Sequence, residues 1–173
     1  MKMLTRLAGL GALALTLGLL AAPAAQASTT TTLKVFADVA PPGTATLSVT
    51  NGDNVTVTAT GCITGTHCAG YGYQGAPPCG PGHPVTTPDG SEYLSGIFCG
   101  TVAAGGDAPK PGQPVGMLLG ENVWNGGNSG WFVVAASRTW TIGHTGTLYL
   151  VYNDSVYSDN TGYYTATVTD NGQ

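Results

Sequence analysis

The sequence has very few charged side chains, and those few do not cluster. Of its 173 residues only 8% are Asp, Glu, Lys or Arg, with five basic residues against nine acidic ones and a formal net charge of −4. Binding to a nucleic-acid backbone requires grouped Lys and Arg side chains that neutralise phosphates. The composition therefore argues against a nucleic-acid partner.

The chain also lacks the residue sets that hydrolases use. It contains no Gly-x-Ser-x-Gly element, and Glu92 and Glu121 are its only glutamates. Asp89 with Glu92 could form the pair of carboxylates that glycoside hydrolysis needs, but both lie in a turn-rich region where solvated carboxylates are the usual case. We therefore expect a protein that is not an enzyme.

No stretch beyond the N-terminus has the apolar period of an amphipathic helix, and this absence favours an all-β fold. Short runs rich in Thr, Val and Tyr alternate with clusters of Gly, Pro, Asn and Asp, which is typical of a sandwich or barrel. The pattern predicts strands at Thr31–Ala37, Thr44–Thr50, Asn54–Thr60, Val115–Gly120, Gly130–Ala135, Arg138–Ile142, Thr147–Tyr152 and Tyr163–Thr169. Residues 31–35 could instead form a loose arm, and residues 61–112 are predicted to be a long loop rich in Gly and Pro.

The first 27 residues have the features of a secretory signal peptide. Lys2 and Arg6 precede an apolar run, and Ala25-Gln26-Ala27 forms an A-x-A cleavage site. The apolar run is short for a membrane span. We expect a secreted, extracellular protein whose mature chain, residues 28–173, forms a single β-sandwich domain without a membrane span.

The four cysteines are predicted to form disulfides, because a secreted chain with an even number of cysteines is usually oxidised. They are Cys62, Cys68, Cys79 and Cys99. Three pairings are open, and we favour Cys62–Cys68 with Cys79–Cys99. The alternative is a metal site that combines Cys62, Cys68 and Cys79 with His67 or His83, although the spacing matches no common zinc pattern.

A polar loop near the C-terminus is the main candidate for a functional site. Two runs that favour strands, residues 148–152 and 163–168, enclose Asn153, Asp154, Asp159 and Asn160, whose side chains all end in oxygen. Two carboxylates held close together repel each other unless a cation lies between them. Calcium prefers such hard oxygen ligands. The alternative is a hairpin whose polar residues serve only the turn.

The amino-acid sequence of this loop resembles that of the calcium loop in the PA-I type galactophilic lectins. The run Leu150-Val151-Tyr152-Asn153-Asp154, then Asp159-Asn160-Thr161-Gly162 and a closing strand, is similar to the calcium loop of that family. Upstream, the Tyr-Gly, Gly-Pro and His-Pro elements of the family are matched in order by Tyr71-Gly72-Tyr73, Gly80-Pro81, His83-Pro84 and Pro88-Asp89-Gly90. The resemblance spans residues 55–168 and implies a galactose-binding-like, jelly-roll-like β-sandwich.

The resemblance also implies a function and a set of site residues. It implies a calcium-dependent lectin in which two neighbouring hydroxyls of a galactose-type sugar complete the calcium shell. The implied metal ligands are Tyr73 and Val156 through their carbonyls and Asp154, Asp159 and Asn160 through their side chains. The implied sugar-binding residues are Tyr71, His83, Asp154, Asp159 and Asn160, and Tyr71 and Tyr73 are alternatives for the carbonyl ligand.

Several departures from the family pattern leave other functions open. The loop between Asp154 and Asp159 is shorter, Asp159 stands where the family has asparagine, and the cysteine-rich stretch could reshape the pocket. The main alternative is a structural or protein-interaction sandwich, with or without calcium, that binds no sugar. A further alternative is an adhesin-like or toxin-like secreted factor without metal. Family members often form multimers, which leaves oligomerisation open.

Overall fold

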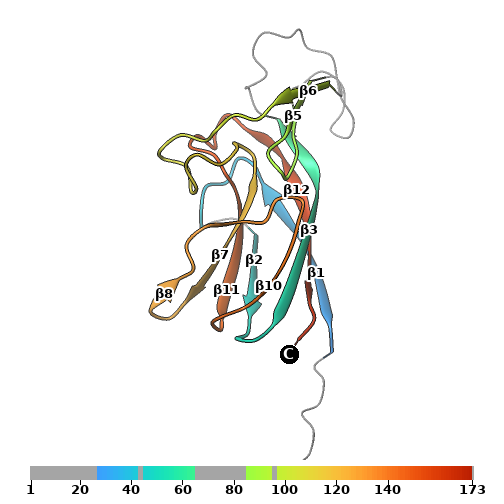
Figure 1. Cartoon of the computed structure of the whole chain (residues 1–173), viewed down its shortest axis with the longest axis vertical. Coiled ribbons are helices and arrows are strands. Elements are labelled where there is room, and N and C mark those ends of the chain that lie inside the picture. The colour runs from blue at the N-terminus through green and yellow to red at the C-terminus, as the bar shows by residue number, and fades with distance from the viewer. Residues whose placement is uncertain (1–26, 43–44, 65–84, 95–96, 173) are drawn as a thin grey trace, which may run out of the picture.

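The computed structural model describes residues 27–42, 45–64, 85–94 and 97–172. Within these residues, all regular secondary structure is β-strand. The strands form two antiparallel sheets that enclose one core (Figure 1). The first sheet has the order β1 (Thr29–Phe36), β12 (Thr161–Asp170), β3 (Asn54–Thr64), β4 (Val85–Thr86), β5 (Glu92–Leu94) and β6 (Ile97–Gly100), with β10 (Ser137–Thr141) also paired to β3. The second has the order β2 (Ala45–Val49), β11 (Gly146–Tyr152), β7 (Leu118–Trp124) and β8 (Gly127–Asn128), with β9 (Phe132–Val133) also paired to β7.

The core lies between the inward faces of the long strands. On β12, Tyr164, Ala166 and Val168 are buried at alternate positions, as expected for a strand with one face toward the core. On β11, Leu148, Leu150 and Tyr152 do the same from the opposite sheet. These side chains have at most 1% of their surface exposed, so their apolar area holds the two sheets together.

The prediction of an all-β fold is confirmed, and each predicted strand overlaps an observed one. Residues 29–36 are not a loose arm, because β1 pairs along its whole length with β12. Some predicted boundaries are wrong. The strand predicted to start at Val115 starts at Leu118 and continues to Trp124, and the one predicted from Gly130 to Ala135 is only two residues long.

The predicted long loop over residues 61–112 is also wrong in part. The strand β3 continues to Thr64, and β4, β5 and β6 extend the first sheet beyond it. These strands have two to four residues, too few for an alternating pattern to be visible in the sequence. Their hydrogen-bonding partners come from neighbouring strands, which sequence spacing does not reveal.

A buried hydroxyl and a glycine join the two sheets at the end of the sandwich near β4. The Tyr164 hydroxyl on β12 lies 2.7 Å from the carbonyl of Gly116 and about as close, at 3.1 and 3.0 Å, to the carbonyls of Thr86 and Thr87. Gly116 has φ of 84°, and a Cβ there would lie 2.2 Å from Thr86 Cγ2. This position therefore requires glycine.

Within the described residues, no helix is long and apolar enough to cross a membrane. The predicted signal peptide lies outside the described residues, except for its last residue, Ala27.

Candidate functional site

The polar loop joins two strands that belong to different sheets. The strand before it, β11, pairs with β2 and β7, whereas the strand after it, β12, pairs with β1 and β3. The loop is therefore a crossing from one sheet to the other, at the rim of the sandwich, and not the turn of a hairpin. The two strands are therefore not a hairpin, because each pairs with other strands. That the polar residues serve only the loop itself stays an alternative.

Asn153 does not belong to the site, although its side chain was predicted to share the loop's oxygen cluster. Its side chain is fully buried and faces the segment 110–114. The amide nitrogen of Asn153 lies 3.1, 3.3 and 3.1 Å from the carbonyls of Lys110, Gln113 and Pro114, and its Oδ1 accepts a hydrogen bond from the Lys110 N–H at 3.0 Å. Asn153 therefore fixes the neighbouring loop.

Asp154 and Asn160, by contrast, are held together as predicted. Asn160 Nδ2 donates to Asp154 Oδ2 at 2.7 Å and to the Val156 carbonyl at 2.8 Å, so both of its amide hydrogens point at these two oxygens. The other carboxylate oxygen, Asp154 Oδ1, accepts from the N–H groups of Ser155 at 2.6 Å and Val156 at 3.2 Å. Both side chains are buried. Three of the predicted ligand residues thus form one compact cluster.

Two tyrosines line the inner side of this cluster. The Tyr152 hydroxyl donates to Asn160 Oδ1 at 3.3 Å, and the Tyr157 hydroxyl donates to the Tyr152 carbonyl at 3.0 Å. Burial, reinforced by the nearby Asp154 carboxylate, raises the pKa of Tyr152 far above its usual range. Burial also raises the pKa of Tyr157. Both hydroxyls therefore stay neutral and remain hydrogen-bond donors.

The sequence prediction missed Tyr152 as a member of the site, although a signal was present. Tyr152 follows Leu148 and Leu150 at two-residue spacing, which places its side chain on the inward face of the strand. A hydroxyl carried into the core needs a partner, and the nearest polar residues along the chain are those of the loop.

The remaining predicted ligands are either apart from the cluster or outside the described residues. Asp159 is exposed, and it makes no hydrogen bond with any other described residue. Its charge is nevertheless near enough to contribute to the raised pKa of Tyr152. Tyr71, Tyr73 and His83, which the resemblance placed on the second wall of the site, lie outside the described residues.

The donor set of the cluster fits a hard cation. Asp154 Oδ2, the Val156 carbonyl and the Asn160 side chain are a carboxylate, a backbone carbonyl and an amide, which are the groups that bind calcium in proteins. Among the described residues, no group of three or more His, Cys, Asp or Glu lies close enough to hold a metal. The cluster is therefore unsuited to zinc, and any cation there depends on amide and carbonyl oxygens.

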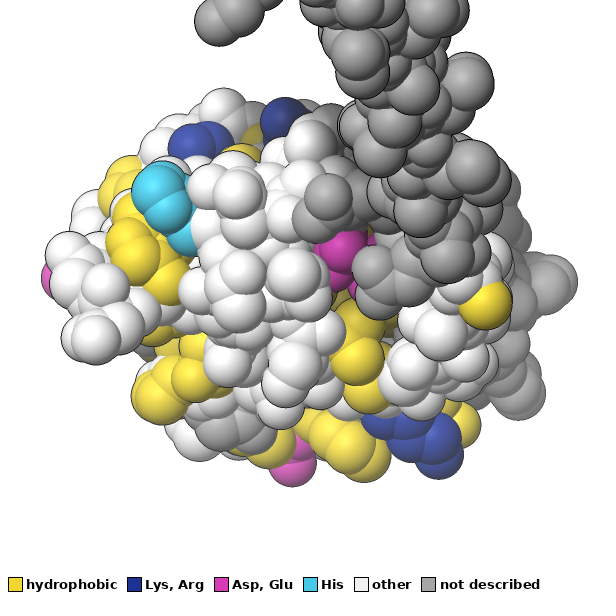
Figure 2. Space-filling view, turned by 90° about the horizontal axis from the view of Figure 1, so that it is seen from below, with side chains coloured by type: hydrophobic (Ala, Val, Ile, Leu, Met, Phe, Trp, Pro, Cys, Tyr) yellow, Lys and Arg dark blue, Asp and Glu magenta, His cyan; other side chains and the backbone are white. Residues whose placement is uncertain are grey.

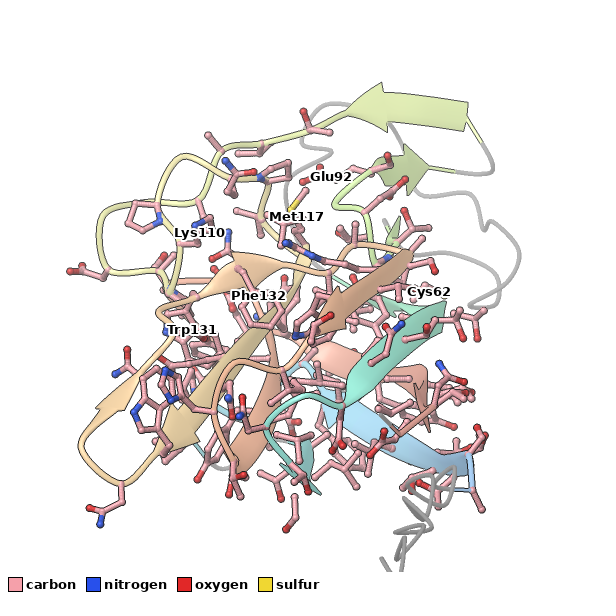
Figure 3. All side chains as sticks on the ribbon, turned by 60° about the horizontal axis from the view of Figure 1, so that its bottom comes forward. Cys62, Glu92, Lys110, Met117, Trp131 and Phe132 are labelled. Atoms are coloured by element: carbon pink, nitrogen blue, oxygen red, sulfur yellow. The ribbon has the colours of Figure 1, made fainter. Side chains whose placement is uncertain are left out.

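The carboxylates of Asp89 and Glu92 have different surroundings. Asp89 is exposed, and it accepts hydrogen bonds from the Thr87 hydroxyl at 2.6 Å and the Ser91 N–H at 3.0 Å. Glu92 is buried on β5, at the end of the sandwich where Lys110 and Met117 also lie (Figure 3). Asp89 thus stabilises a turn, as expected, whereas Glu92 is a buried strand residue and not the solvated carboxylate that the sequence predicted.

The disulfides can be followed only at Cys62, which is buried on β3 and is disulfide-bonded. Cys68 and Cys79 lie outside the described residues, and the side chain of Cys99 on β6 is not described. The pairing Cys62–Cys68 with Cys79–Cys99 stays a prediction.

Comparison with models of protein families finds no match, and no curated protein matches either. Among solved structures, the chain is similar to the N-terminal domain of EclA, described as a PllA-like lectin, with 19% sequence identity and a TM-score of 0.46. The similarity covers 80% of this chain and 94% of that domain.

Proposed function

We propose that this protein is a secreted lectin that binds galactose-type sugars through a calcium ion held by Asp154, Val156 and Asn160. The observation that carries the proposal is the position of the Asn160 amide group. One NH2 group donates to a buried carboxylate at 2.7 Å and to a backbone carbonyl at 2.8 Å. It thereby supplies positive partial charge where two oxygens converge, which is what a cation would do there.

The geometry suits the replacement of the Asn160 NH2 group by a calcium ion between the Asp154 carboxylate and the Val156 carbonyl. Calcium binds oxygen at about 2.3–2.6 Å, only slightly closer than the Asn160 nitrogen lies to the same two oxygens. The Asn160 side chain would hold the ion through its oxygen, and its amide nitrogen would then face the Tyr152 hydroxyl. A bound calcium would offer free coordination positions to sugar hydroxyls.

Asp159 and the upstream residues have supporting roles in this proposal. Asp159 is an exposed residue of the loop, so its carboxylate could reach either the ion or a sugar hydroxyl. Tyr71, Tyr73 and His83 are proposed to form the other side of the sugar site. A sugar whose two neighbouring hydroxyls have the wrong orientation would leave polar groups of the site unpaired. The predicted signal peptide supports an extracellular place of action.

The experiment that tests this function is glycan-array binding with calcium and with chelator. We expect galactose-terminated glycans to be bound in calcium and released by the chelator, because the ion would bridge the chain to the sugar. Calcium-independent binding would contradict the proposed role of the loop. Calcium binding with no bound glycan would favour the structural or protein-interaction module.

The variant Asn160→Asp gives a sharper test of the exchange. It removes the amide donor and places a second carboxylate beside Asp154, so without a cation the two charges should repel and lower the melting temperature. With calcium, the added charge should strengthen binding, and the calcium-dependent rise in melting temperature should exceed that of the wild type. Thermal melts of both proteins in calcium and in chelator measure this.

Asn160→Ala is the matched control, since it removes the same amide without adding charge. It should lower the melting temperature in both conditions and gain little from calcium. A variant Asn160→Asp that calcium does not rescue would show that no cation binds between these side chains.

A further inference from the structure

A cleft lies at the end of the sandwich opposite the polar loop. His144 precedes β11 and Asp154 follows it, and a seven-residue strand spans roughly 20 Å. The cleft opens between the β7–β8–β9 edge of one sheet and β10 of the other, with a volume of about 210 Å³. Figure 2, which views the molecule from this end, shows a histidine beside hydrophobic side chains on the surface.

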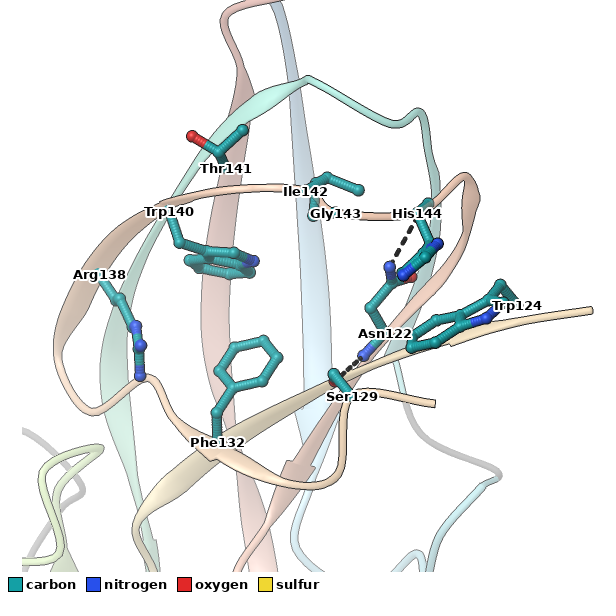
Figure 4. Close-up of a pocket in the computed structure, with 10 residues that line it drawn as sticks. All are labelled: Asn122, Trp124, Ser129, Phe132, Arg138, Trp140, Thr141, Ile142, Gly143 and His144. Atoms are coloured by element: carbon teal, nitrogen blue, oxygen red, sulfur yellow. Dashed lines mark hydrogen bonds between the residues drawn. The ribbon is translucent and has the colours of Figure 1, made fainter. Parts of the chain in front are cut away.

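Aromatic side chains form both walls of this cleft (Figure 4). On one side Phe132 and Trp140 pack edge to face, with ring centroids 5.0 Å apart. On the other side Trp124 stacks on the exposed His144, with ring centroids 4.1 Å apart and planes inclined by 20°. All three larger rings are only half-buried, although Phe132 and Trp140 also pack against the core. The walls are therefore rigid, apolar and accessible.

An exposed cationic group lies at the rim of these walls, and a buried amide lies beneath them. The Arg138 guanidinium lies 5.2 Å from the centre of the Phe132 ring and donates to the Val133 carbonyl, which leaves further N–H groups at the rim. Asn122, which is 4% exposed, donates to the His144 carbonyl at 2.8 Å, but its Oδ1 accepts no hydrogen bond from the described residues. Because this oxygen is buried, it lies beneath the cleft, and Arg138 is the charged group that a ligand in the cleft would meet.

The charge, volume and apolar walls of the cleft indicate which ligands fit it. Its lining residues include Arg138 and no carboxylate, so a cationic ligand is disfavoured. The volume is below the roughly 300–1,000 Å³ of sites for drug-sized molecules. A flat aromatic ligand would stack on the walls but would leave the polar rim without partners. A sugar ring has an apolar C–H face for the walls and hydroxyls for the rim.

We propose that this cleft is a second binding site, independent of calcium, for a single neutral or acidic sugar ring. The ring would rest its C–H face against Trp140 and place its hydroxyls against the Arg138 guanidinium. This site goes beyond the lectin function proposed for the polar loop and shares no residue with it. With this site, one chain would bind two sugar residues, one at each end of the sandwich.

The three tryptophans provide the test, because Trp124 and Trp140 line the cleft whereas Trp131 does not. In chelator, neutral and acidic hexoses titrated into the ¹⁵N-labelled protein should move the indole N–H signals of Trp124 and Trp140 and leave that of Trp131 in place. Single Trp→Phe variants assign the three signals. The same shifts should persist in Asp154→Ala, which separates this site from the calcium loop.

Trp140→Ala should weaken the sugar affinity by about tenfold or more, since it removes the main stacking surface. If this variant fails to fold, Trp140→Phe keeps an aromatic ring and should give a smaller loss. The proposal is overturned if no hexose shifts the Trp140 signal, if Trp131 moves equally, or if the shifts require calcium. It is also overturned if an uncharged aromatic compound shifts these signals while every sugar fails.

Discussion

Replacing Asn153 by alanine should destabilise the protein by about 3–5 kcal/mol, a large part of the stability of an ordinary domain. The Asn153 side chain is fully buried, its Nδ2 faces three backbone carbonyls of the segment 110–114, and its Oδ1 accepts from one N–H. Each buried group left without a partner costs about 1–3 kcal/mol. In thermal melts we expect a fall of roughly 10 °C.

Two further variants make this prediction specific. Asn153→Asp should be about as harmful, because a carboxylate would face carbonyl oxygens instead of donating to them. Asn171→Ala is the matched control, since this asparagine is exposed. Its side chain donates to the Asn54 carbonyl at 3.2 Å and accepts from the Ser28 hydroxyl at 3.4 Å. A loss for Asn153→Ala no larger than that for Asn171→Ala would mean that the segment 110–114 needs no such anchor.

Asp154→Ala should abolish the stabilisation of the protein by calcium and, with it, the binding of galactose-type sugars at the loop. The substitution removes the one buried carboxylate of the cluster. Free calcium at a hundred times its dissociation constant stabilises a native protein by about 2.7 kcal/mol. For a chain of this size the wild type should therefore melt roughly 5–10 °C higher in calcium than in chelator, and the variant should show no difference.

Comparing the melting temperature in calcium with that in chelator, for each protein separately, distinguishes lost calcium binding from a general loss of stability. Asp154 also accepts hydrogen bonds from two N–H groups, so the variant should melt lower than the wild type even in chelator. Asp38→Ala, at an exposed aspartate, should retain the full calcium response. If Asp154→Ala keeps a calcium-dependent rise like that of the wild type, the ion binds elsewhere on the chain.

The sequence predicted the strands well where they are long and alternate, as β11 and β12 do. There the inward positions carry Leu, Ala, Val and Tyr, and burial follows directly from two-residue spacing. It failed for β4, β5 and β6, whose few residues carry no period. Their link to the sheet is the pairing of Ile63 with Thr86, which lie far apart in the chain. Short strands depend on their neighbours for hydrogen bonds, and one sequence does not name those neighbours.

For the candidate site, too, the sequence predicted some features and missed others. Proximity in sequence correctly placed Asp154, Val156 and Asn160 together, because a short loop keeps its residues close. It could not show which way each side chain points. Asn153 faces the segment 110–114 and Asp159 faces solvent, and both directions depend on where the chain enters and leaves the two sheets.

The cleft at the opposite end was harder to foresee. Trp140 packs against the core and also lines the cleft. Trp124 ends β7 and stacks on His144. These residues come together only because β7 and β10, which belong to different sheets, meet at one edge of the sandwich.

The most direct test of the central claim is to follow the side-chain amide of Asn160 by NMR while calcium is added to the chelator-treated protein. This NH2 group now donates to Asp154 Oδ2 and to the Val156 carbonyl, which are the oxygens proposed to hold the ion. The account predicts that its signals move and saturate at one calcium per chain, and that magnesium, which demands stricter geometry, has a weaker effect. Asn160 amide signals that stay in place at saturating calcium would contradict it.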